Sequence, residues 1–231
     1  GLTSLDGCPK TVTGDFNCSR NSLISLFEGP TEVNDFDCSY NQLKNLSYAP
    51  KEVKGNFDCS NNLIDSVKGM PRTVKGYFNC SINKIATLKG GPKYVDATFD
   101  CSQNLIDRLT GGPVSVGQDY LCFKNNLTDL DGVADEIGFD LVSDIRLNHL
   151  SSTFNEEEKT WRYKGSEVIS HIYKPIVALT NVDDISRWLR KHEIKNFTIL
   201  KDNSVNVHGD VKLADKLANL LKLPLNFNII E

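Results

Sequence analysis

Cysteines and histidines are the residues of this chain whose chemistry is most versatile. The 231 residues include seven cysteines and four histidines. Thiolates and imidazoles can bind zinc or act as nucleophile and base, but zinc sites usually hold cysteine pairs two to four residues apart. Six of the cysteines instead recur every 20 or 21 residues: Cys18, Cys38, Cys59, Cys80, Cys101 and Cys122. This spacing argues against a zinc centre and against a disulfide scaffold, and it predicts buried structural thiols.

The remaining candidate groups do not form a recognisable catalytic set. No histidine pair has the spacing of a metal site, and none lies near a nucleophile elbow. No glycine-rich phosphate loop precedes a helix, and the acidic run 156–158 fits a solvated helix start better than a cation site. We therefore expect no catalytic residue, no metal and no cofactor. The histidines concerned are His149, His171, His192 and His208.

Two further columns share the period of the cysteines. An aromatic residue stands two positions before each cysteine, and an asparagine follows three positions after it. The asparagines are Asn21, Asn41, Asn62, Asn83, Asn104 and Asn125. A fixed period of about 20 residues indicates a stacked solenoid. Strand alternation would turn the aromatic and the thiol inward together, and the asparagine amides could satisfy backbone groups where the chain leaves the strand.

The repeat motif is G-x-F-x-C-S-x-N-x-L-x-x-L, followed by G-x-P-x-x-V. In the third unit it runs from Phe57 and Cys59 through Asn62 to Pro71. The motif resembles the leucine-rich repeats, in a form common in bacteriophage proteins of unassigned role, and the resemblance covers residues 1 to about 132. It implies an α/β solenoid with parallel strands on its concave face. It also implies a viral protein that engages a host or virion protein.

The period ends before the chain does, which predicts four segments. They are a leucine-rich-repeat array of a half coil and six repeats over 1–131, a capping connector over 132–150, a small α+β domain over 151–208, and a repeat-like coil over 209–231. Tyr120, Leu121 and Phe123 depart from the motif in the sixth repeat. This departure fits a last coil that the following residues cover, and an apolar contact patch is the alternative.

Inside the third segment the pattern becomes helical and then extended. A helical stretch is expected from Asn155 onward, with one helix over 166–176 and another starting at Asn181 or Asp183. Short strands are expected at 197–199 and 205–207. The repeat template returns from Gly209. Incomplete coils at both ends suggest either a fragment of a longer protein or head-to-tail stacking into a homo-oligomer.

Composition limits the classes of partner and the compartment. The 26 basic and 30 acidic residues give a net charge of −4, whereas a dedicated nucleic-acid binder normally carries a basic stripe. No apolar run approaches the ~18 residues of a membrane span, and no signal peptide is visible. We expect no nucleic-acid or membrane partner. The expected location is the cytoplasm, that of the host if the protein is phage-encoded, or the virion.

The outward positions of the predicted strands form the candidate site. They are mostly acidic or amide residues, next to a column that varies freely just after each strand. We expect this face to bind a protein partner with a basic surface. The candidate contact residues are Asp15, Asn17, Asp35, Asp37, Tyr40, Asp58, Asn61, Tyr77, Asn79, Asp100 and Gln103.

Three functions remain open at this point. The first is a non-enzymatic protein-interaction module that uses the concave face. The second is an assembly component built by head-to-tail stacking. The third is a targeting arm for an effector or enzyme domain within 133–208.

Overall fold

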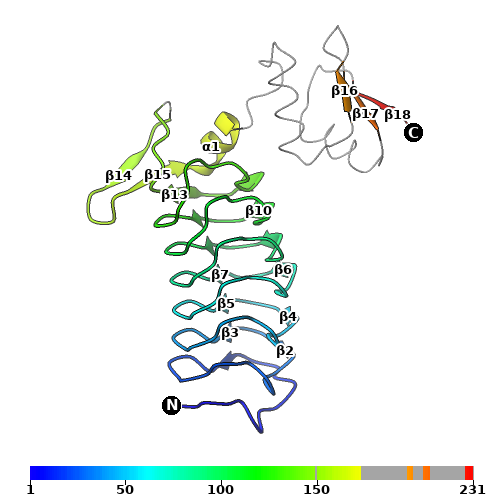
Figure 1. Cartoon of the computed structure of the whole chain (residues 1–231), viewed down its shortest axis with the longest axis vertical. Helices are drawn as coiled ribbons and strands as arrows, with labels where there is room; N and C mark the ends of the chain where they lie inside the picture. The colour runs from blue at the N-terminus through cyan, green and yellow to red at the C-terminus, as the bar shows by residue number, and fades with distance from the viewer. Residues whose placement is uncertain (149, 173–196, 200–204, 209–226, 231) are drawn as a thin grey trace. The chain divides into compact units, whose positions relative to one another are not determined.

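The computed structural model describes residues 1–148, 150–172, 197–199, 205–208 and 227–230. The chain divides into two compact units, Gly1–Ile169 and Ser170–Glu231. The first unit is a parallel-strand β-solenoid of about six turns, with its coils stacked along one axis (Figure 1). The predicted solenoid is therefore confirmed.

The main ladder is built from the aromatic-x-cysteine segments. Phe57 lies opposite Phe78, and Phe78 lies opposite Phe99, so every coil is in register with the next. The rings of Phe78 and Phe99 stack with centroids 5.7 Å apart and fill the interior. Parallel pairing joins β1 (Phe16–Asn17), β3 (Phe36–Asp37), β5 (Phe57–Asp58), β7 (Phe78–Asn79), β9 (Phe99–Asp100), β11 (Tyr120–Leu121) and β13 (Asp140–Ser143).

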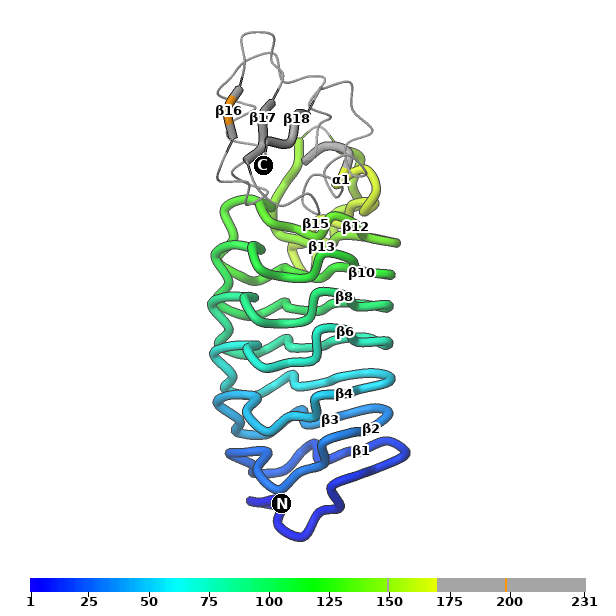
Figure 2. The backbone as a smooth tube through the Cα atoms, turned by 90° about the vertical axis from the view of Figure 1, so that its right-hand side faces the viewer, coloured from blue at the N-terminus to red at the C-terminus, as the bar shows by residue number. Residues whose placement is uncertain are grey.

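A second set of short strands runs along another side of the coils (Figure 2). Each contributes one buried aliphatic residue, such as Val74 or Val95, to the same interior. One sheet pairs β2 (Glu32–Val33) with β4 (Glu52–Val53), and the other joins β6 (Thr73–Val74), β8 (Tyr94–Val95), β10 (Ser115–Val116) and β12 (Glu136–Ile137).

These second strands correct the expected α/β class. Within the described part of the chain, the one helix is α1 (Gly165–Ile172), which lies outside the repeats. A coil of about 21 residues has to fit two strands, two aliphatic contacts and a Gly-x-Pro turn. The glycine and proline interrupt any helical pattern between successive strands. The return side is therefore extended, and the solenoid contains almost no helix.

The asparagine ladder ties neighbouring coils together. The Asn62 amide nitrogen donates to the carbonyls of Cys59 and Ser60 in its own coil, at 3.2 and 3.1 Å, and to Cys38 in the preceding coil at 3.0 Å. Its Oδ1 accepts the buried N–H of Leu43 at 3.0 Å. The expected role of this column is confirmed, and the amide also bridges two coils. The same set recurs at Asn41, Asn83, Asn104 and Asn125.

The cysteine ladder is a column of buried free thiols. Cys38, Cys59, Cys80, Cys101 and Cys122 have no exposed surface. The Cys59 thiol lies 3.4 Å from the carbonyl of Asn79 in the next coil. Burial raises the pKa of Cys59 well above its ordinary value and that of Cys18 to about 12. These thiols stay protonated at neutral pH and act as small apolar side chains.

Residues 132–143, in the segment expected to be a connector, extend the solenoid. β12 and β13 add a rung to each ladder, with Ile137 beside Val116 and Leu141 beside Tyr120. The segment expected to be only a capping connector therefore continues the coil. Phe123 is only 9% exposed, so the described residues that follow cover the last motif-bearing coil as predicted.

A β-hairpin then closes this end of the main ladder. β14 (Thr153–Asn155) pairs with β15 (Thr160–Lys164), and β15 runs antiparallel beside β13. The expected helical stretch from Asn155 is wrong in its first part. Asn155 Oδ1 accepts the N–H groups of Glu157 and Glu158, both at 3.0 Å, as a helix cap would, but it does so inside the hairpin turn. Tyr163, 1% exposed, anchors the hairpin in the core.

The described part of the second unit is a small sheet. β16 (Phe197–Ile199) runs antiparallel to β17 (Val205–His208), and β17 runs parallel to β18 (Phe227–Ile230). The two strands expected near 197 and 205 are confirmed. The expected helix at 181–192 and the returning template from Gly209 to Pro224 lie outside the described residues. None of the described helices is long and apolar enough to cross a membrane.

We expect Asn62→Ala to lower the free energy of unfolding by about 1–3 kcal/mol, because the buried N–H of Leu43 loses its acceptor and three carbonyls lose a donor. Thermal unfolding followed by circular dichroism measures the loss. The control is Asn61→Gly, since Asn61 has a φ of +54° that glycine adopts freely. An Asn62→Ala variant that melts with the wild type would contradict the bridging role.

We expect iodoacetamide to modify at most Cys8 in the native protein, because this thiol is partly exposed while the other six are buried. Protonation slows thiolate chemistry further. Mass spectrometry after brief labelling at pH 8 counts the modified thiols, and the denatured chain should take up seven labels. Rapid native labelling of Cys59 or Cys80 would contradict a packed thiol ladder.

Candidate functional site

The outward side chains of the main ladder form one continuous surface, which we call the acid–amide face. It consists of the residues one and three positions before each ladder cysteine. Its members are Asp15, Asn17, Asp35, Asp37, Asn56, Asp58, Tyr77, Asn79, Thr98, Asp100, Asp119 and the apolar Leu121. All the predicted contact residues except Tyr40, Asn61 and Gln103 lie on this face.

The inner column of the face stabilises the turn after each strand. Asp37 Oδ1 accepts the backbone N–H of Ser39 at 2.9 Å and its hydroxyl at 2.7 Å. Asn79 makes the same two contacts with Ser81, at 3.0 and 2.8 Å. The turn therefore requires an oxygen at this position but does not require a negative charge. Sequence reasoning missed this role because it treated these residues only as outward-facing.

The second carboxylate oxygen of this column faces the neighbouring coil. Asn79 Nδ2 donates to Asp58 Oδ2, and Asn17 Nδ2 donates to Asp37 Oδ2, both at 3.1 Å. Aspartates and asparagines thus form hydrogen-bonded pairs along the ladder. Asp100 differs, since Oδ1 accepts the N–H of Ser102 at 2.9 Å while no side-chain amide of the described residues pairs with its other oxygen.

The outer column bonds from each coil to the next. Asp35 Oδ1 accepts the N–H of Asn56 at 2.8 Å, and Asn56 Oδ1 accepts that of Tyr77 at 3.0 Å. The Asp35 carboxylate lies so close to the backbone of the next coil that a Cβ at Gly55 would be 1.9 Å from its Oδ1. A side chain at position 55 would therefore displace the Asp35 carboxylate from the hydrogen bond that it accepts. The outer column is therefore part of the scaffold as well as part of the surface.

Burial and mutual repulsion govern the electrostatics of the face. Burial raises the pKa of Asp58 and of Asp100 above their ordinary values, against the opposing hydrogen bonds from the serines. Burial also raises the pKa of Tyr77, and the charges of Asp58, Asp37 and Asp35 add to the shift. Tyr77 thus lies within the field of three carboxylates. At Asp58 and Asp100 the ionised carboxylate therefore costs free energy that a cationic partner would recover.

A hollow of about 470 Å³ opens at the middle of the face. Tyr77, 38% exposed, provides an apolar wall, and Asp100 provides a carboxylate. The hollow can accommodate a side chain with an aliphatic stem and a cationic head. The remaining lining comes from Asn56, Phe78, Asn79, Ala97, Thr98 and Gln118.

One arginine of the chain already docks on the outer column. Arg162, from β15, places Nη1 2.9 Å from Asp140 Oδ2 and 3.6 Å from Asp119 Oδ2. These two carboxylates occupy equivalent positions in adjacent coils, since β11 and β13 pair in register. The hydrogen bond with Asp140 is the main cause that raises the pKa of Arg162. This contact was not predicted because the hairpin that carries Arg162 was not predicted.

The variable column lies at the edge of the face, in a strained backbone. Every member has a φ between +52° and +55°. Residues other than glycine or asparagine pay roughly 1–2 kcal/mol there, and a β-branched residue such as Ile82 is an outlier. Backbone preference therefore does not explain which side chains occur. The column comprises Arg20, Tyr40, Asn61, Ile82, Gln103 and Lys124.

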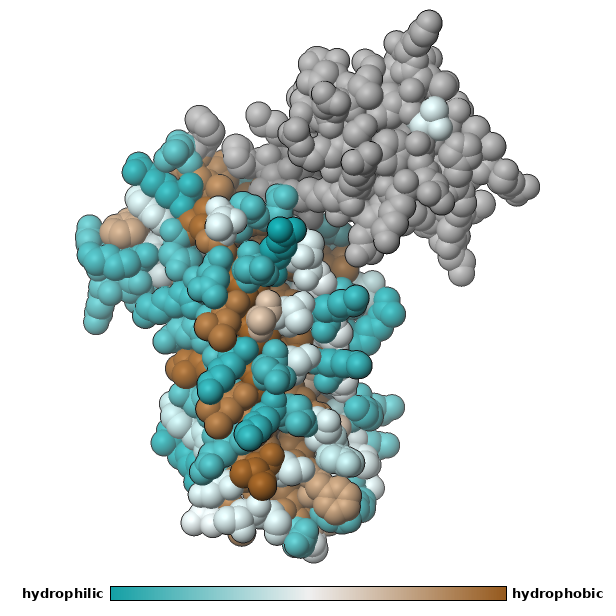
Figure 3. All heavy atoms as spheres, in the orientation of Figure 1, coloured by the Kyte–Doolittle hydropathy of each residue, from teal (hydrophilic) through white to brown (hydrophobic). Residues whose placement is uncertain are grey.

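Apolar surface on the coils is interrupted by polar side chains (Figure 3). Leu63 and Leu105 are 39% and 50% exposed at equivalent positions, but Lys84 stands between them in the stack. The exposed hydrophobic residues therefore do not form one stripe along this column. The acid–amide face is the more continuous candidate surface.

Comparison with family models, curated proteins and solved structures gives no match for this chain. The resemblance to leucine-rich repeats thus depends on the motif alone. Among the described residues, no group of three or more histidine, cysteine or acidic side chains is arranged to hold a metal ion. What the geometry offers is an ordered, acidic surface.

We expect Asp100→Asn to melt at or above the wild-type temperature at pH 7. The carboxylate has a raised pKa in the folded state, so its charge opposes folding at neutral pH and this penalty is relieved as the pH falls. The difference between variant and wild type should therefore shrink as the pH approaches the ordinary carboxyl value of 3.8.

Differential scanning fluorimetry from pH 7 to pH 4 measures this trend. Asp65→Asn, which removes an exposed carboxylate outside the face, is the control. A variant advantage that grows toward low pH would show that the sign assigned to Asp100 is wrong.

Proposed function

We propose that this protein is a non-enzymatic interaction module whose acid–amide face binds a partner protein with a basic surface. The observation that carries the proposal is the docking of Arg162 across Asp119 and Asp140. It supplies, inside the chain, an example of a guanidinium held by carboxylates of adjacent coils. A partner arginine or lysine would meet the same chemistry at the uncovered coils.

The presence of aspartate at positions where asparagine makes the same turn contacts supports this proposal. Asn17 and Asn79 make the turn contacts as well as Asp37 does, so asparagine would serve the turn at each of these positions. Ionised carboxylates at Asp58 and Asp100 are disfavoured by burial. Aspartates at these two positions therefore lower stability, which is common at functional sites. Charge-based recognition of a cationic partner would account for their presence.

The repeat motif supports a narrower version of the proposal. We infer from its resemblance that the coils are leucine-rich repeats of the bacteriophage type and that the partner is a host or virion protein. The outward residues would then provide affinity, with the variable column adding specificity. The acidic charge would mainly accelerate encounter, so binding should weaken as salt is added.

Affinity capture with matched charge variants tests the proposed function. The face variant combines Asp37→Asn, Asp58→Asn and Asp100→Asn. The control variant combines Asp6→Asn, Asp65→Asn and Asp107→Asn, all at exposed positions outside the face. Both lose three negative charges. We expect immobilised wild type and control to retain the same protein from a bacterial extract, and the face variant to lose it.

Added salt should release the captured protein from wild type and control alike. Circular dichroism of the three proteins verifies that the fold is kept. Equal capture by the face variant and the control would contradict recognition through the acid–amide face.

A further inference from the structure

A second surface departs from the repeat at the turn that precedes each proline. Five coils place glycine at the left-handed position of this turn, with φ between +82° and +92°. Two adjacent coils instead place Glu28 and Tyr48 there, at φ of +66° and +69°. A non-glycine residue costs about 1–2 kcal/mol in this conformation. The glycines are Gly7, Gly69, Gly90, Gly111 and Gly132.

In the coil of Glu28, the residue before this left-handed position also departs from the repeat. It holds Phe27, whereas the other coils hold polar or charged residues. Phe27 and Tyr48 are 53% and 59% exposed and meet edge to face, with ring centroids 5.2 Å apart and planes at 78°. Two large aromatic side chains thus remain open to solvent in neighbouring coils. The polar equivalents are Asp6, Ser47, Lys68, Lys89, Thr110 and Asp131.

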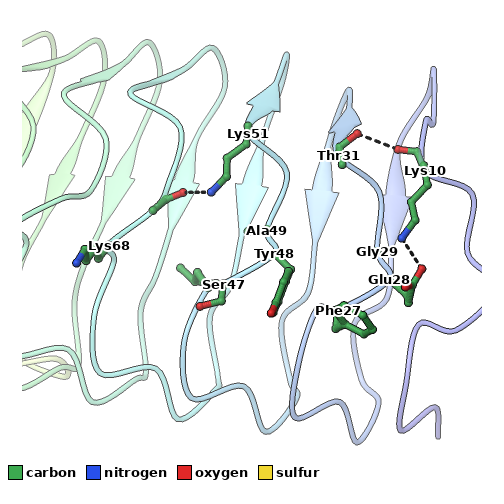
Figure 4. Close-up of a pocket in the computed structure, with 12 residues that line it drawn as sticks. Lys10, Phe27, Glu28, Gly29, Thr31, Ser47, Tyr48, Ala49, Lys51 and Lys68 are labelled. Atoms are coloured by element: carbon green, nitrogen blue, oxygen red, sulfur yellow. Dashed lines mark hydrogen bonds and ion pairs between the residues drawn. The ribbon is translucent and has the colours of Figure 1, made fainter.

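These rings border a hollow of about 690 Å³, which we call the aromatic groove (Figure 4). Figure 4 shows the rings side by side on adjacent coils, with lysines around them. Leu46 and Ala49, both buried, contribute further apolar lining. The groove is large enough for an aromatic or branched aliphatic side chain.

The charges around the groove are mainly positive. Lys10, Lys51 and Lys68 line it, against the single carboxylate of Glu28. Lys10 neutralises that carboxylate in an ion pair of 2.5 Å, and Lys51 donates to the Gly69 carbonyl at 2.9 Å. Lys51 and Lys68 therefore leave the groove with an excess of positive charge, although the whole chain has a net charge of −4.

We propose that the aromatic groove binds a short acidic peptide segment of a partner protein through one apolar anchor residue. The anchor packs against Phe27 and Tyr48, while carboxylates beside it meet Lys51 and Lys68. Buried aromatic contact supplies most of the affinity, and the lysines select acidic neighbours. This ligand has the opposite charge to the partner of the acid–amide face, so the two sites would bind different ligands.

Two other occupants fit the groove less well. A neutral carbohydrate could stack on the rings, but it would leave the positive charges of Lys51 and Lys68 without a carboxylate to meet. A second copy of this chain could offer Tyr77, which lies among Asp35, Asp37 and Asp58, but this ring is only 38% exposed and presents less surface than the side chain of a short segment. Both occupants are outcomes that the experiment distinguishes.

The probe is a pool of fluorescent acidic hexapeptides, each with one Leu, Phe, Tyr or Trp among Asp and Glu residues. Fluorescence polarisation measures binding to the full chain. We expect micromolar-range binding of at least one member, and replacement of its anchor by Ala should weaken it about tenfold or more.

A groove variant combines Phe27→Ser and Tyr48→Gly, the residue types that other coils carry at these positions. It should weaken peptide binding about tenfold or more. Its melting temperature should stay within a few degrees of the wild-type value, because glycine relieves the left-handed backbone at position 48. Lys68→Gln should weaken binding about threefold. Lys89 occupies the position equivalent to Lys68 in the next coil and does not line the groove, so Lys89→Gln should leave binding unchanged.

Three results would overturn the proposal. The first is that no peptide of the pool binds, or that the groove and Lys68 variants bind as well as wild type. The second is that neutral cello- and chito-oligosaccharides bind to the groove in preference to the peptides. The third is concentration-dependent self-association in sedimentation velocity that the groove variant abolishes. None of these readouts depends on the acid–amide face, so the proposed function and this inference can fail separately.

Discussion

The hydrogen bonding of one asparagine per coil is the constraint on which the solenoid depends. From Asn41 to Asn125 each amide donates to carbonyls of two coils and accepts an N–H from the preceding one, as at Asn62. A shift of one residue in either coil would leave buried backbone groups unpaired, at a cost of about 1–3 kcal/mol each. The asparagine therefore fixes the period, and the fixed period brings phenylalanine onto phenylalanine and thiol onto thiol.

That constraint leaves little of the coil free. Even the outward aspartates cap turns or accept an N–H from the next coil, as Asp37 and Asp35 do. Candidate functional residues are therefore those with a property that the fold does not require. At Asp100 the turn requires an oxygen acceptor but not a negative charge, and at Tyr48 it requires a left-handed backbone but not an aromatic ring. In both cases the retained side chain costs stability.

The interior was predictable from sequence because the same local pattern of residues recurs in every coil. Period, strand alternation and the amide chemistry of Asn62 lead directly to the ladders. The closing hairpin was not predictable, because Asn155 and the following glutamates carry the signals of a helix start, and pairing with β13 decides the outcome. The Arg162 contact depends on that hairpin. In the sequence, the aromatic groove is marked only by Glu28 and Tyr48 at positions where other coils carry glycine. The structure shows that these positions have a positive φ, which explains why glycine is usual there.

Two surfaces of opposite charge follow from one stacked scaffold. The ladder repeats a carboxylate or amide at the spacing of the coils, so the acid–amide face is extended and suits a surface with several cations. The aromatic groove arises from departures in two coils only, so it is local and suits a single anchored segment. A solenoid can hold both because each coil contacts only its neighbours. A strained turn at Tyr48 then perturbs its own coil and leaves the ladder elsewhere in register.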